Sequence, residues 1–196
     1  TLMCGVFGYT GKQIANDLVF QGLKRLEYRG YDSWGIAVND KQNIQVFKTV
    51  GEITDREELK KLPLANTAIG HTRWATHGGV TTNNAHPHSS ENKFFTLVQN
   101  GIVENYSELK KSLEQKGYTF KTQTYTEVIV KLIENEQKSK KPVKACITKA
   151  FRLLKGRNTI VSLTKDNYVY AIRNGSPLVI GKSKDGIFLA SDALSF

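Results

Sequence analysis

Residues 71–78 read His-Thr-Arg-Trp-Ala-Thr-His-Gly, and they follow a buried strand that the apolar run at 67–70 predicts. All four histidines of the chain lie within residues 71–88. Their spacing matches no zinc signature and no acidic residue lies between them, so the pattern favours a substrate-binding loop over a metal site. In such a loop Arg73 can bind a carboxylate through two parallel hydrogen bonds, and the glycines let the loop close.

Two other short segments carry groups suited to nucleophilic catalysis. Cys4 lies in a glycine-flanked apolar segment at the start of the chain. Its thiolate could attack a carbonyl carbon if its own α-amine were free to act as the base. Asn100 and Gly101 end a predicted strand, where a side-chain amide and a backbone N–H can hold an oxyanion. On position alone, a buried inert cysteine and a simple Asn-Gly turn are the plainer interpretations.

The rest of the pattern predicts helices grouped between antiparallel strands, and therefore an α+β fold without an internal boundary. Helices are expected at 14–26, 107–115, 126–137 and 143–154, with a short surface helix at 54–61. Thr124 and Glu127 have the form of a reciprocal capping box, and Asn105 with Glu108 repeats it more weakly. Strands are expected at 2–9, 35–39, 44–49, 67–70, 94–98, 159–163, 168–173, 177–180 and 186–190.

The charge, the apolar runs and the glycine and cysteine patterns of the chain argue against several classes of function. The chain has 196 residues and a formal net charge of +10, but its basic residues are scattered, which favours a solvated surface over nucleic-acid binding. No apolar run reaches the ~20 residues that span a bilayer, so we expect no membrane association and a cytoplasmic location. Neither nucleotide-binding glycine motif is present, and we expect no cofactor. The two cysteines form no zinc or disulfide pattern, and Cys146 is expected in the core.

Taken together, seven segments resemble the class II, N-terminal-nucleophile glutamine amidotransferases, in the order of that family and over nearly the whole chain. The segments are residues 3–9, 22–33, 71–78, 84–88, 100–106, 175–181 and 189–193. The Arg-Gly-Tyr-Asp-Ser block at 29–33 and the block at 71–77 favour the glutamine–fructose-6-phosphate aminotransferase branch over the phosphoribosyl-pyrophosphate amidotransferases. The resemblance implies a four-layer αββα sandwich of the N-terminal nucleophile hydrolase type.

The resemblance also implies how the reacting groups divide the work. It implies that Cys4 attacks the side-chain amide of L-glutamine and releases ammonia and glutamate. Asn100 and Gly101 are implied to hold the tetrahedral oxyanion, and Arg29 to support the region around the nucleophile.

A second set of implied roles concerns binding and partners. Arg73 is implied to bind the α-carboxylate of glutamine, with Thr76 and His77 on the same loop. Trp74 is implied to gate ammonia on its way to a sugar isomerase domain of the same full-length chain, where fructose 6-phosphate is the acceptor. A homodimer formed through that domain is also implied, and no metal.

Three positions depart from the pattern of the family. Tyr125 stands where the family has the aspartate that binds the α-ammonium of glutamine, Gln99 where it has a histidine, and Trp34 where it has a small residue. Loss of that aspartate predicts weak or absent glutaminase activity unless another group binds the ammonium. A weakened relative that binds glutamine or a protein partner is the alternative, and a zinc hydrolase built on the histidines is a more remote one.

The ends of the chain give two further expectations. The glutaminase domain of the family continues past Asp192, so we expect residues 1–196 to be one amidotransferase domain, truncated at its C-terminal end and without the isomerase domain. Met3 precedes Cys4 as an initiator methionine would. We therefore expect catalysis to require removal of residues 1–3, which frees the α-amine of Cys4.

Overall fold

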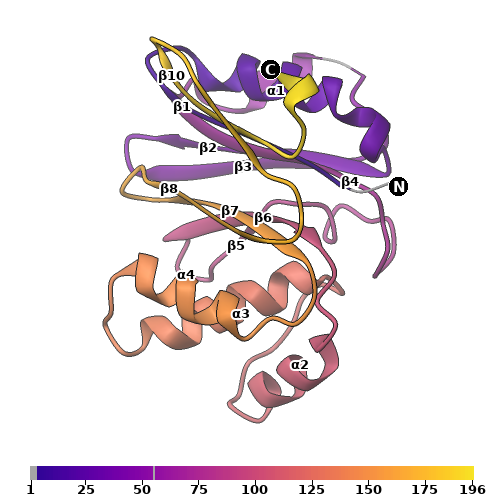
Figure 1. Ribbon diagram of the computed structural model, residues 1–196, viewed down its shortest axis with the longest axis vertical. Coiled ribbons are helices and arrows are strands. Elements are labelled where there is room, and N and C mark those ends of the chain that lie inside the picture. The colour runs from indigo at the N-terminus through magenta and orange to yellow at the C-terminus, as the bar shows by residue number, and fades with distance from the viewer. Residues whose placement is uncertain (1–3, 55) are drawn as a thin grey trace.

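The computed structural model describes residues 4–54 and 56–196. Within them two antiparallel sheets lie face to face, and helices cover the outer face of each sheet (Figure 1). In that view the layers run from α1 at the top, through the two sheets, to α2, α3 and α4 at the bottom.

The first sheet has six strands in the order β3-β2-β4-β1-β10-β9. They are β1 (Gly5–Gly11), β2 (Ser33–Asp40), β3 (Asn43–Val50), β4 (Thr67–Arg73), β9 (Val179–Lys182) and β10 (Gly186–Ala190). Helix α1 (Ala15–Arg25) packs on the outer face, where Leu23 and Trp34 are among the buried residues. The strands predicted at 35–39 and 44–49 pair as the hairpin of β2 and β3, which turns at Lys41 and Gln42, both with the positive φ of a type I′ turn.

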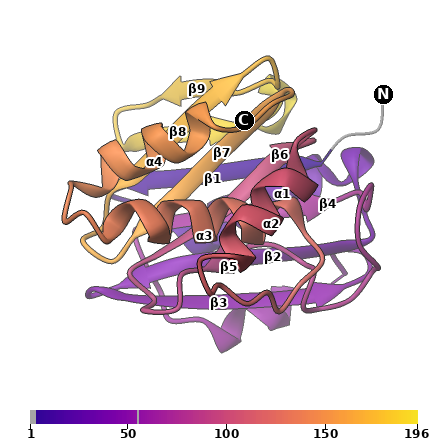
Figure 2. The ribbon, with the colours of Figure 1, turned by 90° about the horizontal axis from the view of Figure 1, so that it is seen from below.

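The second sheet has four strands in the order β5-β6-β7-β8. They are β5 (His88–Ser89), β6 (Phe95–Gly101), β7 (Asn158–Thr164) and β8 (Val169–Asn174). Figure 2 shows this sheet from below, covered by α2 (Tyr106–Glu114), α3 (Tyr125–Gln137) and α4 (Val143–Arg152). Cys146 lies in the core between these helices and the sheet, as predicted.

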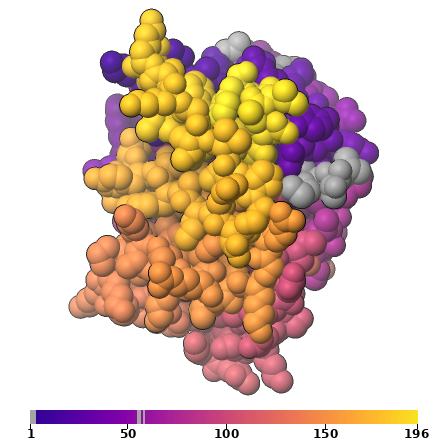
Figure 3. Space-filling view, in the orientation of Figure 1, coloured from indigo at the N-terminus to yellow at the C-terminus, as the bar shows by residue number. Residues whose placement is uncertain are grey.

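The inner faces of the two sheets meet in an apolar layer of branched and small side chains. Its buried members are Val6, Ala37, Ile69, Val98, Val161, Leu163 and Leu189, which come from strands of both sheets. The predicted α+β fold with four αββα layers is therefore confirmed. After β8 the chain crosses back to the first sheet, and its C-terminal segments, orange to yellow, form much of the face shown in Figure 3.

The two predicted capping boxes are wrong in part. Thr124 does cap α3, because its Oγ1 accepts from the Glu127 N–H at 3.2 Å. The Glu127 carboxylate, however, accepts from the N–H groups of Lys121 (2.8 Å) and Thr122 (2.6 Å) instead of returning to Thr124, because the turn before the helix aims those groups at it. Asn105 makes no cap with its side chain, which binds across to the segment after α4.

Smaller differences concern the ends of elements. Strand β4 continues to Arg73, three residues beyond the predicted end, because it is buried along its whole length beneath the second sheet. The segment predicted as a surface helix at 54–61 contains a 3₁₀ helix, Arg56–Lys61, and residue 55 lies outside the described residues. So do the first residues of the strand predicted at 2–9. Short 3₁₀ helices also occur at Glu27–Arg29 and Ala193–Ser195. No helix in the described part of the chain has the length and apolar character to cross a bilayer.

Candidate active site

Cys4 lies directly before β1, at one end of the first sheet, and is held from both sheets. Its carbonyl oxygen accepts from Asn100 Nδ2 at 2.9 Å and from Arg29 Nε at 3.3 Å. Its Sγ lies 3.3 Å from the backbone nitrogen of Trp74, which donates to it, and 3.5 Å from the Trp74 carbonyl oxygen. The structure thus brings the predicted nucleophile together with three of the predicted site residues.

Burial raises the pKa of the Cys4 thiol, against the opposing effects of the Trp74 N–H and the nearby positive charges of Arg73 and Arg29. A half-buried thiol whose pKa is raised above its usual value is mostly protonated at neutral pH, so nucleophilic attack requires a base. In the printed sequence the nitrogen of Cys4 is in a peptide bond to Met3. The three preceding residues lie outside the described part of the chain.

The Arg-Gly-Tyr-Asp-Ser block joins the nucleophile to the loop after β4. Arg29 pairs with Asp192 at 3.3 Å while it holds Cys4, and Asp32 Oδ2 accepts from the Ala75 N–H at 2.7 Å. A Cβ at Gly30 would lie 2.6 Å from the carbonyl carbon of Arg73, so only glycine allows this approach. Asp32 and Asp192 are positioning residues that sequence reasoning missed, although both lie in segments that carry the family resemblance.

Gly101 ends β6 in a backbone conformation that favours glycine, with φ of 134°. A Cβ at this position would lie 2.0 Å from the Arg157 carbonyl oxygen. Its neighbour Asn100 is buried and donates one of its amide hydrogens to Cys4, which leaves its second hydrogen for the adjacent cavity. The two predicted oxyanion donors are therefore beside the nucleophile.

Arg73 organises the loop that follows it. Its guanidinium donates to the carbonyl oxygens of His77 (2.6 Å), Gly78 (3.3 Å) and Gly79 (3.0 Å). The loop is also tied to the segment before α3, since the Gly79 N–H donates to Gln123 Oε1. Arg73 is buried, and of its five N–H groups these contacts account for three. Carboxylate binding by Arg73 stays a prediction.

Tyr125 lies in an aromatic cluster with two neighbouring rings. It stacks on His77 with ring centroids 4.6 Å apart and packs edge-on against Tyr106 at 5.2 Å. Burial raises the pKa of the Tyr125 hydroxyl. The cavity bordered by Tyr125, His77, Arg73, Thr76 and Cys4 has a volume of only about 30 Å³. A side chain without charge therefore occupies the place from which the family's aspartate is missing.

A larger cavity of about 350 Å³ also borders Cys4, Trp74, Thr76 and Gly101. Its wall includes Trp74, Thr76, Asn100 and Gly101 together with Ile102, Glu104, Arg157 and residues 175–177. Glu104 is the one carboxylate that borders either cavity among the residues described. Glu104 and Arg157 were missed as site residues, because the chain gives no local sign that they meet at a cavity.

Three of the four histidines are buried side by side, and one of them, His86, also borders the small cavity. His71, His86 and His88 are buried, and their rings form a continuous row with centroids 4.0 and 4.9 Å apart. Burial lowers the pKa of His71 to about 3 and lowers the pKa values of the other two well below the usual range. In the described ranges no group of three or more His, Cys, Asp or Glu side chains is arranged to hold a metal ion. His77 lies apart, on the loop beside Tyr125.

Known proteins share both the sequence and the fold. A family model described as a glutamine amidotransferase domain matches residues 54–195, more than half of the chain. The chain belongs to the glutamine amidotransferase family. Among its relatives, the glutamine–fructose-6-phosphate aminotransferase of Helicobacter pylori is 47% identical over 96% of this chain and 32% of that protein, and the one of Bacteroides thetaiotaomicron is 44% identical over 97% and 32%. This amidotransferase chain thus spans about a third of the length of the curated relatives it matches.

Solved structures confirm the fold type. A glutamine phosphoribosylpyrophosphate amidotransferase from B. subtilis, complexed with ADP and GMP, aligns with a TM-score of 0.87 at 31% identity, over 98% of this amidotransferase chain and 43% of that one. An allosteric regulatory enzyme of purine biosynthesis aligns with a TM-score of 0.89 at 32% identity, over the same shares of the two chains. The predicted N-terminal nucleophile hydrolase type of sandwich is therefore confirmed, as is the predicted family.

Proposed function

We propose that residues 1–196 are a glutaminase domain that hydrolyses L-glutamine and supplies ammonia to a sugar isomerase domain of the same full-length chain. The observation that carries this proposal is the placement of Cys4. Cys4 borders both cavities while Asn100 and Arg29 hold its carbonyl oxygen. The relatives favour this enzyme over a domain that only binds glutamine.

The proposed reaction begins with a free α-amine on Cys4. The amine takes the thiol proton as sulfur attacks the amide carbon of glutamine, and the oxyanion is bound by the Gly101 N–H and the free hydrogen of Asn100 Nδ2. Collapse of this intermediate breaks the C–N bond, and the protonated amine gives its proton to the leaving ammonia. Water then attacks the thioester, with the amine as base, and releases glutamate and the thiol.

Two parts of the site are expected to recognise the substrate, namely the loop after β4 and the wall of the larger cavity. We expect Arg73, with Thr76 and His77, to bind the α-carboxylate of glutamine. Tyr125 offers no negative charge to the α-ammonium. Among the described residues Glu104 supplies the one carboxylate in the walls of the two cavities at Cys4, and we expect it to take over this contact.

The acceptor side of the reaction follows from the relatives alone. By their printed name they act on fructose 6-phosphate, and this chain matches about a third of their length. We propose the same acceptor here, with Trp74 as the gate through which ammonia leaves and with a homodimer formed through the isomerase domain. A cytoplasmic location fits this metabolic role.

The proposed function is tested with protein whose first residue is Cys4. Incubation with glutamine should yield equal amounts of glutamate and ammonia, and a diazoketone analogue of glutamine should label Cys4 covalently. Cys4→Ala should abolish both results. Cys146→Ser, which changes the buried second cysteine, is the matched control and should retain both. Turnover that survives Cys4→Ala would contradict the proposal.

A further inference from the structure

A continuous set of hydrogen bonds runs from α3 through β6 to β7 and ends at the backbone of Gly101 and Ile102. Thr126 Oγ1 lies 2.8 Å from His86 Nε2 and donates to Gln99 Oε1 at 3.0 Å. Gln99 Nε2 donates to the Gly101 carbonyl oxygen at 2.9 Å and to Asn158 Oδ1 at 2.8 Å. Asn158 Nδ2 then donates to the Ile102 carbonyl oxygen at 3.0 Å. All four side chains are buried.

Which group donates and which accepts in each of these hydrogen bonds follows from the backbone carbonyl groups at one end of the network. The carbonyl oxygens of Gly101 and Ile102 can only accept, so the amide nitrogens of Gln99 and Asn158 must face them. The oxygen of Gln99 is then turned to Thr126, whose single hydroxyl proton it accepts. Thr126 must therefore accept from His86, which fixes the proton of that neutral histidine on Nε2.

The side-chain amides of Gln99 and Asn158 bind the carbonyl groups of two consecutive residues, Gly101 and Ile102. The backbone of Gly101 has a conformation that favours glycine. Gly101 has φ of 134°, and its Cα side faces the Arg157 carbonyl oxygen and the Cα of Asn158. With the Gly101 carbonyl bound by Gln99 and the Ile102 carbonyl bound by Asn158, neither of the two peptide groups that follow Gly101 can rotate without breaking a buried hydrogen bond. Because the peptide group after Gly101 is held in this way, the Gly101 N–H in the peptide group before it is limited in how it can turn toward the cavity.

We infer that Gln99 and Asn158 act as a pair of positioning residues that set the oxyanion-binding direction of the Gly101 N–H. This inference rests on the proposed glutaminase function. Asn158 borders neither cavity at the nucleophile, and Gln99 borders only the small one, so the pair acts through the backbone. A neutral histidine, the residue that the family pattern has at position 99, supplies one donor and one acceptor, whereas this network uses two donors and one acceptor of Gln99.

The test compares amide-removing variants in protein that begins at Cys4. Gln99→Met keeps the length of the side chain and removes all three hydrogen bonds, and Asn158→Leu removes its partner. Asn39→Leu is the matched control, because Asn39 is a buried amide that donates to the Thr164 and Lys165 carbonyl oxygens, at the opposite end of β2 from the nucleophile. Folding of each variant is checked by urea denaturation.

Steady-state kinetics give the first readout. An oxyanion is present only in the reaction, so kcat should fall about tenfold or more in Gln99→Met and in Asn158→Leu, with KM changed less than twofold. The control should keep the parent kcat. A kcat loss below tenfold in both variants, or an equal loss in the control, overturns the inference.

Thiol labelling gives a second readout that does not depend on turnover. Iodoacetamide needs no oxyanion site, whereas a glutamine analogue with a ketone beside its leaving group does. The ratio of the two inactivation rates should shift about tenfold against the ketone in both variants and stay constant in Asn39→Leu. An unchanged ratio overturns the inference. A parent protein without glutaminase activity or Cys4 labelling contradicts the proposed function itself, which is a distinct result.

Discussion

At the scale of single residues, we predict that Tyr125 and Glu104 decide how well this chain binds glutamine. Tyr125 begins α3, stacks on His77 and carries no charge. The α-ammonium of an amino acid loses its water on binding and requires a negative or strongly polar partner in exchange. In the part of the chain that the structure describes, Glu104 supplies the only carboxylate in the walls of the two cavities at Cys4.

We predict opposite effects on the KM for glutamine at these two positions. Tyr125→Asp should lower KM, because it restores a carboxylate at the start of a helix, where negative charge is also favoured. Glu104→Gln should raise KM about tenfold or more, and neither change should alter the labelling of Cys4 by iodoacetamide. Initial rates over a range of glutamine concentrations measure both. Unchanged turnover in Tyr125→Asp would contradict the assigned role of position 125.

We expect His71 to make the stability of the protein sensitive to acid. It is fully buried, its Nε2 lies 3.0 Å from the Gln99 carbonyl oxygen, and its pKa is lowered to about 3 by burial. In the unfolded chain the same histidine takes up a proton near pH 6.5. The unfolded state therefore binds more protons between pH 6.5 and 3, and stability falls as the pH falls through that range.

We predict that His71→Gln reduces this dependence. Glutamine can still donate to the Gln99 carbonyl but takes up no proton. The stability that is lost between pH 7.5 and pH 5.5 should be about 1.4 kcal/mol smaller in the variant. Urea denaturation at the two pH values measures the difference. An equal loss in parent and variant would show that other groups account for the acid sensitivity.

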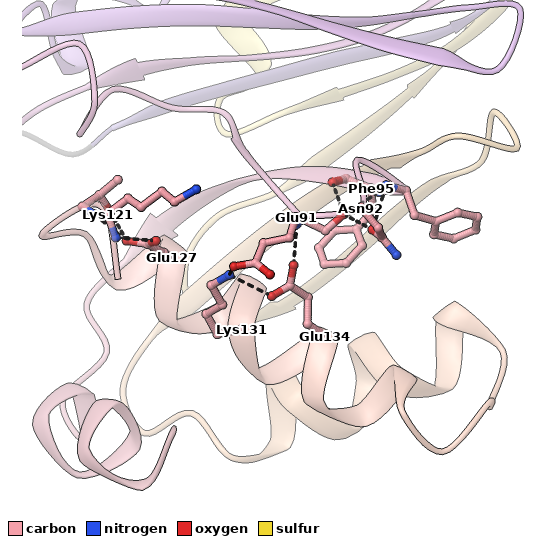
Figure 4. A network of polar contacts seen from close by, with 10 residues as sticks. Glu91, Asn92, Phe95, Lys121, Glu127, Lys131 and Glu134 are labelled. Carbon is pink, nitrogen blue, oxygen red and sulfur yellow. Dashed lines mark hydrogen bonds and ion pairs between the residues drawn. The ribbon is translucent and has the colours of Figure 1, made fainter. Parts of the chain in front are cut away.

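At the scale of elements, the start of α3 is held by the carboxylate of Glu127. The local sequence pattern predicts that this carboxylate returns to Thr124, whereas it binds the turn before the helix. Glu127 is buried and accepts from two backbone N–H groups and from the hydroxyl of Thr122. Figure 4 shows it near Lys121, together with a second network in which Lys131 pairs with Glu91 at 2.7 Å and Glu134 at 3.1 Å. The contacts of Glu127 with Lys121 and Thr122 fix the turn that precedes Thr124 and Tyr125.

We predict that Glu127→Gln lowers the free energy of unfolding by about 2–3 kcal/mol, because one amide oxygen cannot accept all three donors of the charged carboxylate. Glu114→Gln, an exposed change of the same type on α2, is the control and should stay within about 0.5 kcal/mol of the parent. Chemical denaturation compares the two. Equal stabilities for the two variants would contradict the role given to Glu127.

The elements themselves were predictable, because their signals are local. The apolar spacing over 14–26 and the run at 186–190 correspond closely to α1 and β10. The contacts that build the site are not local. Asp32 binds a residue 43 positions away and Gln99 binds one 59 positions away, and no periodic pattern connects such partners. Only the resemblance to a family brought Cys4, Arg73 and Asn100 together before the structure did.

At the scale of the whole molecule, the site depends on how the two sheets are stacked. Cys4 enters with β1 of the first sheet, and Asn100 and Gly101 end β6 of the second. The apolar layer between the sheets, which includes Leu163, therefore sets the distance between Cys4 and the proposed oxyanion donors Asn100 and Gly101.

We predict that Leu163→Ala costs about 2–5 kcal/mol of stability, because it opens a cavity in this layer. Leu194→Ala removes the same atoms from a side chain that is 77% exposed, and it should cost at most about 0.5 kcal/mol. Thermal or urea denaturation of both variants tests the difference. Similar losses in the two variants would show that the layer contributes little.

The two cysteines differ in a way that makes the fold easy to monitor. Cys146 is 1% exposed in the helical core, whereas Cys4 borders two cavities. A chromogenic disulfide should therefore react with one thiol per native molecule and with two after unfolding. The rate at which the second equivalent appears reports how often the helices lift from the second sheet. The reaction of Cys146 therefore measures local opening of the helical layer without an added label.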